Sequence, residues 1–370
     1  MAAALQTGEN GMVKTLRLKV DPARLDTEES KSAIAQAAQI LRAGGLVALP
    51  TETVYGLGAN ALDSAAVARI FEAKQRPSWD PIIVHIAGPV AQNPMLATLV
   101  TNMPSVAHDL MRAFWPGPLT LLLPRTAAVP DIVTAGRRLV GIRMPAHPVA
   151  WELIRQAGVP VAAPSANVFG HISPTTAEHV LEDLDGKINA VLDAGPTLHG
   201  VESTVLDPNQ HPMMIYRPGA TTANQIREVA GSVETLQEKI LPAAAARDAL
   251  PSPGVGLRHY APRARLILVE GTISELPSRL AEAARLHEKR RLGVMLPEEL
   301  ANVDLGAPLR AGAEFAWGRW SAPEGLAEKL YAGLRALDAQ GCDVILCPLP
   351  EPGGIGDAIR DRLRKAAHSE

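Results

Sequence analysis

Two pairs of polar residues have the types and spacing to bind phosphate groups. Lys74 and Arg76 flank one glutamine at the predicted end of a helix, where a compact ammonium and a two-pronged guanidinium would suit a triphosphate. The alternative is ordinary favourable charge at a helix C-terminus. Ser165 and Asn167 follow a predicted buried strand, and they either bind a ligand at its carboxyl end or cap the segment that follows.

Further polar residues stand singly near predicted strands: His85, Arg143, Ser203 and Arg217. Each alone is typical of a surface group. Together they supply cations and hydroxyls, and the sequence shows no Ser-His-Asp, Cys-His or paired-carboxylate pattern. We therefore expect catalysis by positioning and charge stabilisation rather than through a covalent nucleophile.

The composition limits the class of protein. The chain has 370 residues and a net charge of −3, which indicates two domains and argues against a polybasic protein. Hydrophobic residues make up 47%, which excludes global disorder. Two cysteines, Cys342 and Cys347, give neither a disulfide framework nor a CxxC zinc pair. Without a long apolar run or an apolar signal core, we expect a cytoplasmic protein with no membrane segment.

The order of predicted elements divides the chain at residues 13–230, 231–263 and 264–370. In the first part, strands follow one another without a regular β-α-β-α rhythm, which favours an α+β domain with a mixed sheet. A helix is predicted over Ser30–Ala43 with Ser30 as its N-cap, and Thr51–Gly58 is predicted as a loop. The middle part is rich in alanine and proline and is predicted as a linker. The last part indicates a small open α/β sheet.

The end of the predicted linker has unusually specific chemistry. The run from Ser252 to Pro262 includes Arg258, His259 and Tyr260. A linker this long suggests a function. We expect it to be a lid that lays these side chains over a site in the first domain.

In order and spacing, a set of motifs resembles the two-domain form of the threonylcarbamoyl-AMP synthase family over roughly residues 15–365. The matching runs are PTETVYGLG (50–58), KxRP (74–77), IVHIA (83–87), WPGPLTL (115–121), RMPxHP (143–148), APSAN (163–167), SPTTAEHV (173–180), GVESTVLD (200–207), RPGA (217–220) and the linker SPG…RHYAP. The resemblance implies a YrdC-like mixed-sheet domain with a concave, positively lined cavity, followed by a small α/β, Rossmann-like domain.

The resemblance also implies a reaction. L-threonine and bicarbonate or CO2 form a carbamate, whose oxygen attacks the α-phosphate of ATP and displaces pyrophosphate. The product, threonylcarbamoyl-AMP, would be used by a separate transferase complex that modifies tRNA. The enzyme would thus be a nucleotidyltransferase. Mg2+ would arrive with ATP, because the sequence shows no dedicated protein cage for a metal.

The resemblance assigns roles to residues at the matching positions. Lys74 and Arg76 would be catalytic and would neutralise the triphosphate, with Arg143 as the partner of the threonine carboxylate. The positions assigned to ATP are Lys74, Arg76, Asp80, Leu139, Ser165, Asn167, Ser173, Arg217 and Tyr260. The positions assigned to threonine are Thr53, His85, Arg143, Ala163 and Ser203. The lid positions are Arg258, His259 and Tyr260, which would exclude water from a carbamate and a mixed anhydride.

Two positions depart from the family pattern. Asp80 stands where relatives often have asparagine, and its negative charge beside phosphates would require Mg2+ or an arginine. Leu139 stands where they often have threonine, so a contact there would come from the backbone.

Three alternatives remain at this point. A YrdC-like concavity could bind double-stranded RNA by shape, although the near-neutral charge favours weak RNA binding at most. A hydrogenase-maturation carbamoyltransferase carries a similar domain together with CxxC pairs, which are absent from this sequence. A purely regulatory protein would not need intact phosphate-binding and hydroxyl sets. Threonine-dependent pyrophosphate release would separate these hypotheses.

Overall fold

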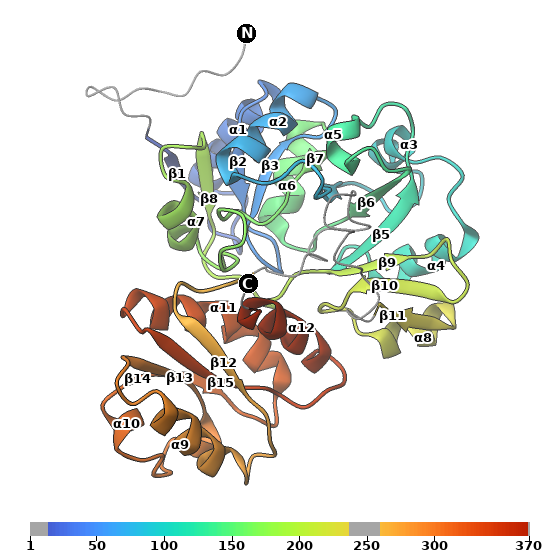
Figure 1. Cartoon of the computed structure of the whole chain (residues 1–370). Coiled ribbons are helices and arrows are strands. Elements are labelled where there is room, and N and C mark those ends of the chain that lie inside the picture. Colours follow the sequence, from blue (N-terminus) through green and yellow to red (C-terminus); the bar gives the residue numbers. More distant parts are fainter. Residues whose placement is uncertain (1–13, 237–259, 369–370) are drawn as a thin grey trace. The chain divides into compact units, whose positions relative to one another are not determined.

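The computed structural model describes residues 14–236 and 260–368, which form two compact units (Figure 1). The first unit contains most of residues 14–236. The second contains the described part of Leu257–Glu370 together with Gly170–Ser173 and His199–Val201. The lid residues Arg258 and His259 lie outside the described residues.

The strands of the first unit are β1 (Leu16–Lys19), β2 (Val47–Leu49), β3 (Gly56–Asn60), β4 (Val84–His85), β5 (Leu119–Pro124), β6 (Leu139–Arg143), β7 (Val161–Ala162), β8 (Ala190–Asp193), β9 (Thr204–Asp207), β10 (Met213–Arg217) and β11 (Val233–Thr235). Its helices are α1 (Glu28–Arg42), α2 (Ser64–Lys74), α3 (Pro94–Leu99), α4 (Ser105–Phe114), α5 (Asp131–Thr134), α6 (Pro148–Ala157), α7 (Ala177–Leu184) and α8 (Ala223–Ala230).

The strands of the second unit are β12 (Arg265–Val269), β13 (Leu292–Pro297), β14 (Ala313–Gly318) and β15 (Val344–Pro348). Its helices are α9 (Leu276–Leu286), the short 3-10 helix η3 (Glu298–Leu300), α10 (Ala307–Arg310), α11 (Pro323–Ala339) and α12 (Gly356–Ala367). Within residues 14–236 and 260–368, no helix combines the length and the apolar character needed to cross a membrane.

The sheet of the first unit is mixed. Its described strands run in the order β1-β8-β2-β3-β7-β4-β6-β5-β9-β10-β11, and parallel pairs such as β5 with β9 alternate with antiparallel pairs such as β5 with β6. Helices pack on both faces, because side chains of a strand alternate in direction. In β2, Ala48 faces one hydrophobic cluster, while Val47 and Leu49 face the other. This confirms the predicted α+β class.

The second unit is a parallel sheet with the strand order β12-β15-β13-β14. Its described helices connect and cover the strands, as parallel connections require. Leu280 of α9 packs with Val294 of β13 and Leu346 of β15 in a hydrophobic core. The predicted small α/β domain is therefore present.

The ends of two helices show how local sequence positions the chain. Thr27, not Ser30, caps α1 by accepting a hydrogen bond from the Ser30 amide, so the predicted cap is wrong by one turn. Asp63 caps α2 in the same manner, and Gln75 ends that helix in the left-handed conformation at φ 53°. Lys74 is therefore the last residue of the helix, and Arg76 begins the turn-containing segment that follows.

Two strands occur where the sequence analysis predicts loop or linker. Residues Gly56–Gly58 belong to β3, although Thr51–Gly58 was expected to be a loop. A Cβ at Gly58 would lie 2.9 Å from both Leu49 Cδ2 and Val161 Cγ1, so glycine is required here by close strand packing rather than by a turn. Similarly, β11 lies inside the predicted linker, where it pairs in parallel with β10.

Candidate active site

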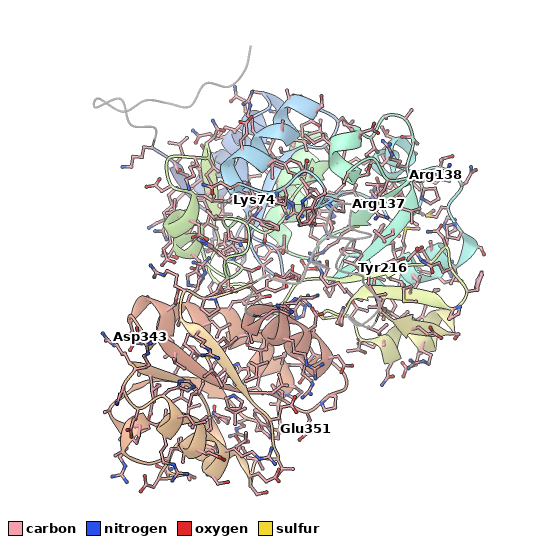
Figure 2. All side chains as sticks on the ribbon, viewed as in Figure 1. Lys74, Arg137, Arg138, Tyr216, Asp343 and Glu351 are labelled. Carbon is pink, nitrogen blue, oxygen red and sulfur yellow. The ribbon has the colours of Figure 1, made fainter. Side chains whose placement is uncertain are left out.

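Lys74 joins the two predicted phosphate-binding runs. Its side chain, labelled in Figure 2, is buried. Nζ donates hydrogen bonds to the backbone carbonyl oxygens of Ser165, at 2.5 Å, and Asn167. Burial, followed by the charge of Arg76, sets the pKa of Lys74 well below its ordinary value. An arriving triphosphate would favour the charged form again, so this lysine is suited to respond to a polyanion.

Arg76 forms an ion pair with Asp80 and so supplies the positive charge that a carboxylate at this position was expected to need. Its Nη2 lies 2.9 Å from Asp80 Oδ2, and both side chains are almost fully buried. Arg76 also donates from Nε to the Asp80 carbonyl at 3.2 Å and from Nη2 to the Pro81 carbonyl at 2.8 Å. Burial raises the pKa of Asp80 more than the charges of Arg76, Lys74 and Arg217 lower it. The structure thus places three predicted phosphate-binding cations around this carboxyl group.

The loop that follows β7 is held by β3 and the residues before it. The amide of Leu57 donates to the carbonyl of Pro164 at 2.7 Å, and Ser165 forms an isolated bridge with Gly56. Asn167 is buried and donates from Nδ2 to the carbonyl of Val168 at 2.9 Å. The small residues of this run therefore fix their backbone carbonyls beside Lys74. Ala163 is buried at the start of the same run, where its amide donates to the Ile83 carbonyl.

Two of the predicted threonine-binding residues, Thr53 and His85, lie beside Arg143 at the end of β6. Its Nη1 donates to Thr53 Oγ1 at 3.0 Å, its Nε donates to the Gly117 carbonyl at 3.3 Å, and its Nη2 lies 2.7 Å from Glu52 Oε1. His85 is its direct partner across the parallel β4–β6 pair. The guanidinium is thus fixed from three sides.

His85 is a neutral group in this cluster. Burial, with the charge of Arg143, lowers the pKa of His85 to about 3, against an ordinary value of 6.5. Its Nδ1 has no hydrogen-bond partner in the described part of the chain. An uncharged imidazole with a spare nitrogen can exchange a hydrogen bond with a polar substrate group.

Ser203 and Arg217 connect the predicted threonine and nucleotide sets. Arg217 donates to the Ser203 carbonyl from Nε at 3.1 Å and from Nη2 at 3.0 Å, and Nη2 also reaches Ser203 Oγ at 3.1 Å. The hydroxyls of Ser203 and Thr120 share a hydrogen bond of 2.9 Å. The charge of Arg217 also lowers the pKa of Asp80. Because Ser203 is hydrogen-bonded to Arg217, it lies beside the cluster of cations around Asp80.

The remaining predicted site residues in the described part of the chain are Leu139, Ser173 and Tyr260. Leu139 begins β6, at the opposite end of that strand from Arg143, and packs against the apolar cluster that includes Leu122. Ser173 and Tyr260 belong to the second compact unit, and both are buried. Within that unit, the Tyr260 ring stacks on Tyr331 with centroids 5.7 Å apart.

Sequence reasoning missed two residues of the Arg143 and Ser203 surroundings. Glu52 pairs with Arg143, and the Thr120 hydroxyl is hydrogen-bonded to the Ser203 hydroxyl. Glu52 stands directly before Thr53 in the PTETVYGLG run, and Thr120 lies in the WPGPLTL run. Both residues therefore lie within the motifs that resemble the family, but neither residue type nor spacing distinguishes them from their neighbours there.

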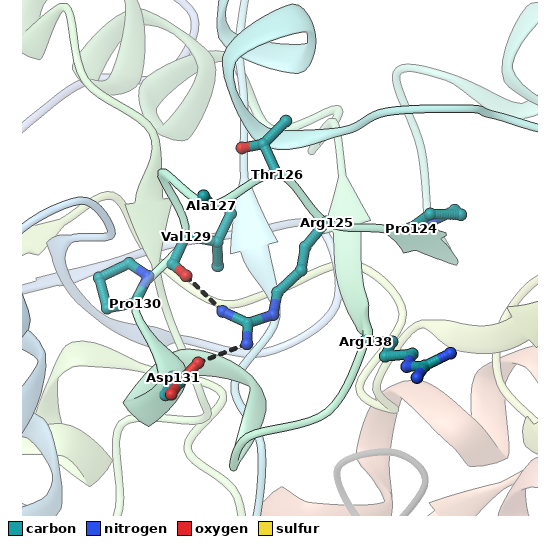
Figure 3. Close-up of a pocket in the computed structure, with 8 residues that line it drawn as sticks. All are labelled: Pro124, Arg125, Thr126, Ala127, Val129, Pro130, Asp131 and Arg138. Atoms are coloured by element: carbon teal, nitrogen blue, oxygen red, sulfur yellow. Dashed lines mark hydrogen bonds and ion pairs between the residues drawn. The ribbon is translucent and has the colours of Figure 1, made fainter.

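A surface pocket of about 670 Å³ lies beside the start of β6, where Arg138 precedes Leu139 (Figure 3). Arg125 crosses it, donating to the Val129 carbonyl at 2.6 Å and pairing with Asp131. None of the predicted site residues lines it, and one of its two arginines, Arg125, is already paired with protein groups. Elsewhere in the described residues, no three His, Cys, Asp or Glu side chains gather as metal ligands.

The chain matches two family patterns in series. The pattern described as "Telomere recombination" covers residues 39–219, and the pattern described as "Threonylcarbamoyl-AMP synthase, C-terminal domain" covers residues 221–368. Together they span both compact units.

Similar proteins extend over nearly the whole chain. A threonylcarbamoyl-AMP synthase of Pyrococcus abyssi is 43% identical, covering 90% of this chain and 93% of its own. One from Bacillus subtilis is 44% identical, covering 96% and 98%. The solved structure of P. abyssi Sua5 complexed with L-threonine superposes with a TM-score of 0.85 at 41% identity, covering 95% of this chain and 98% of that one.

Proposed function

This chain belongs to the threonylcarbamoyl-AMP synthase family, and we propose that it makes threonylcarbamoyl-AMP and pyrophosphate from L-threonine, bicarbonate or CO2, and ATP. The single structural observation that supports this is the junction at Lys74. One buried lysine brings the Lys74–Arg76 pair and the Ser165–Asn167 loop together. A relative crystallised with L-threonine supports the choice of amino acid.

In this proposal, ATP binds at Lys74, Arg76 and Arg217. The carbamate oxygen forms a bond to the α-phosphorus, while the bond from that phosphorus to the leaving pyrophosphate breaks. Negative charge then moves to pyrophosphate, where the fixed cations Lys74, Arg76 and Arg217 would stabilise it. This stabilisation is strongest when water is excluded from the site. The reaction is a nucleotidyl transfer that needs no covalent enzyme intermediate.

The proposal places threonine around Arg143, Thr53, His85 and Ser203. Arg143 is held by protein groups on three sides, so its remaining N–H donors have fixed directions for the threonine carboxylate. Ser203 is bonded to Arg217, so the carbamate would form beside the nucleotide. The linker residues Arg258, His259 and Tyr260 would close the site against water.

Mg2+ is proposed to enter with ATP. The described residues contain no three-ligand cage, which suits an ion held mainly by phosphates and water. Asp80 is an acidic residue in the cationic cluster, and its Oδ1 accepts no hydrogen bond from residues 14–236 or 260–368. This oxygen fits an indirect contact to the ion, while Arg76 balances the carboxylate charge. Bound Mg2+ would offset phosphate charge.

The experiment is pyrophosphate release from ATP, Mg2+ and bicarbonate, with and without L-threonine, and with L-serine as the control. Strict dependence on threonine supports the proposal. Release without threonine, or no release, contradicts it and makes salt-titrated RNA binding the next measurement. Transfer of the product to tRNA by a separate transferase complex is the proposed next step.

A further inference from the structure

An α-amino acid presents two opposite charges to its site. The predicted threonine set contains a cation, Arg143, for the carboxylate. It contains no anion for the ammonium, because Thr53 and Ser203 are hydroxyls and His85 is neutral at physiological pH. A buried ammonium without a compensating charge would be costly. The site therefore needs an acidic group that the motif assignments do not supply.

Glu52 is an acidic residue that lies beside Arg143, where this negative charge is needed. It is 5% exposed, and its Oε1 lies 2.7 Å from Arg143 Nη2. Within the described residues, its other neighbours are the backbone N–H groups of Glu52 and Ala146, and neither carboxylate oxygen accepts a hydrogen bond of good geometry from them, so lone pairs remain for a further donor. A zwitterion carries its own carboxylate and ammonium only two bonds from each other. It can therefore meet a neighbouring arginine and glutamate together.

We propose that Glu52 binds the α-ammonium of threonine while Arg143 binds its carboxylate. This inference rests on the proposed function, and it makes Glu52 the residue that selects an amino acid over the matching hydroxy acid. A ligand that lacks the ammonium would leave the buried Glu52 carboxylate without its second partner. That unpaired carboxylate would weaken the binding of the hydroxy acid relative to threonine.

The charges around Glu52 agree with an ionised carboxylate. Burial raises its pKa, but the charge and hydrogen bonding of Arg143, with the backbone N–H groups of Glu52 and Ala146, lower it further, so the pKa lies below its ordinary value. His85 and His147 also face this carboxylate, and burial lowers the pKa of each. Glu52 is therefore the negative group facing Arg143.

The test compares two ligands on one variant. Wild type and Glu52→Gln are titrated by calorimetry with L-threonine and with 2,3-dihydroxybutanoate of matching stereochemistry, which replaces the ammonium by a hydroxyl. We expect Glu52→Gln to weaken threonine binding at least tenfold, while affinity for the hydroxy acid changes less than twofold. Glu178→Gln, which removes a surface glutamate paired with Arg17, is the matched control and should leave both affinities unchanged.

Equal losses for both ligands, or no loss for threonine, would overturn the role of Glu52. Glu52→Gln could fail to fold because it leaves Arg143 unpaired, and in that case Glu52→Asp is titrated with the same two ligands. A loss of affinity for threonine alone supports the inference. Equal losses of affinity for both ligands, or no loss, contradict it. Wild-type pyrophosphate release is measured in parallel. Its failure would contradict the proposed function, whereas normal release with unselective variants contradicts only Glu52.

Discussion

Lys74 Nζ lies 2.5 Å from the backbone carbonyl oxygen of Ser165, a residue 91 positions further along the chain. The bond ties the end of α2 to the loop after β7. Because the lysine is almost completely buried and its second acceptor is the Asn167 carbonyl, the contact also serves the fold. One side chain thus holds a proposed phosphate site together and supplies part of its charge.

Replacing Lys74 with methionine should remove both functions. We expect threonine-dependent pyrophosphate release to fall at least a hundredfold, and the free energy of unfolding to fall by about 1–3 kcal/mol, because two buried carbonyls lose their donor. Lys187→Met is the control, since that lysine is exposed and its hydrogen-bond partner among the residues that the structure describes is the nearby Asp183 carbonyl. Activity within threefold of wild type in Lys74→Met would exclude the lysine from phosphate binding.

The Arg76–Asp80 pair allows stability and activity to be separated. Arg76→Met leaves a buried carboxylate without its ion-pair partner, which should cost roughly 3–5 kcal/mol of unfolding free energy. The double variant Arg76→Met/Asp80→Asn removes both charges and should recover most of that stability. We expect it to remain inactive, because the triphosphate still lacks Arg76. Denaturant unfolding and pyrophosphate release measure the two effects, and an active double variant would remove Arg76 from the site.

Local patterns predicted those parts of the fold that depend on local chemistry. The sequence predicts the end of a helix at Lys74 and Arg76, and α2 does end at Lys74. In β3 the same approach failed, because glycine usually marks a loop. Gly58 is in a strand because Leu49 and Val161 pack against the place of its missing side chain, a contact between distant segments. The three residues of β11 form a strand through pairing with β10.

In the candidate site, too, the sequence predicts what depends on neighbouring residues and misses what depends on contacts between distant ones. The types and spacing of Lys74 and Arg76 suggested a phosphate clamp, and the resemblance of ordered motifs supplied the remaining assignments. Glu52 was missed because its importance lies in an ion pair with Arg143, 91 residues away, which no spacing along the chain reveals. Buried charge is informative only once its partner is known.

Gly219 fixes the backbone beside Ser203, and a methyl group there should disturb the site. A Cβ at Gly219 would lie 2.3 Å from the Thr204 amide nitrogen and 2.5 Å from the Glu202 carbonyl oxygen. We therefore expect Gly219→Ala to reduce the free energy of unfolding by roughly 1–3 kcal/mol and to raise KM for threonine. Gly325→Ala is the control, because its added Cβ would meet no atom within 4 Å. Unchanged KM and stability in Gly219→Ala would contradict this account.

His85 should make the fold sensitive to acid. Its folded pKa of about 3 lies below the ordinary value of 6.5, so between these values the unfolded chain binds a proton that the folded chain does not. Stability from this group is therefore complete above pH 6.5 and falls as the pH falls, by about 2 kcal/mol between pH 7 and pH 5. Urea unfolding at the two pH values measures the difference. His85→Gln should reduce it by about that amount. An unchanged acid response in His85→Gln would show that this imidazole is protonated in the folded protein, and it would then repel the adjacent Arg143 instead of offering threonine a neutral nitrogen.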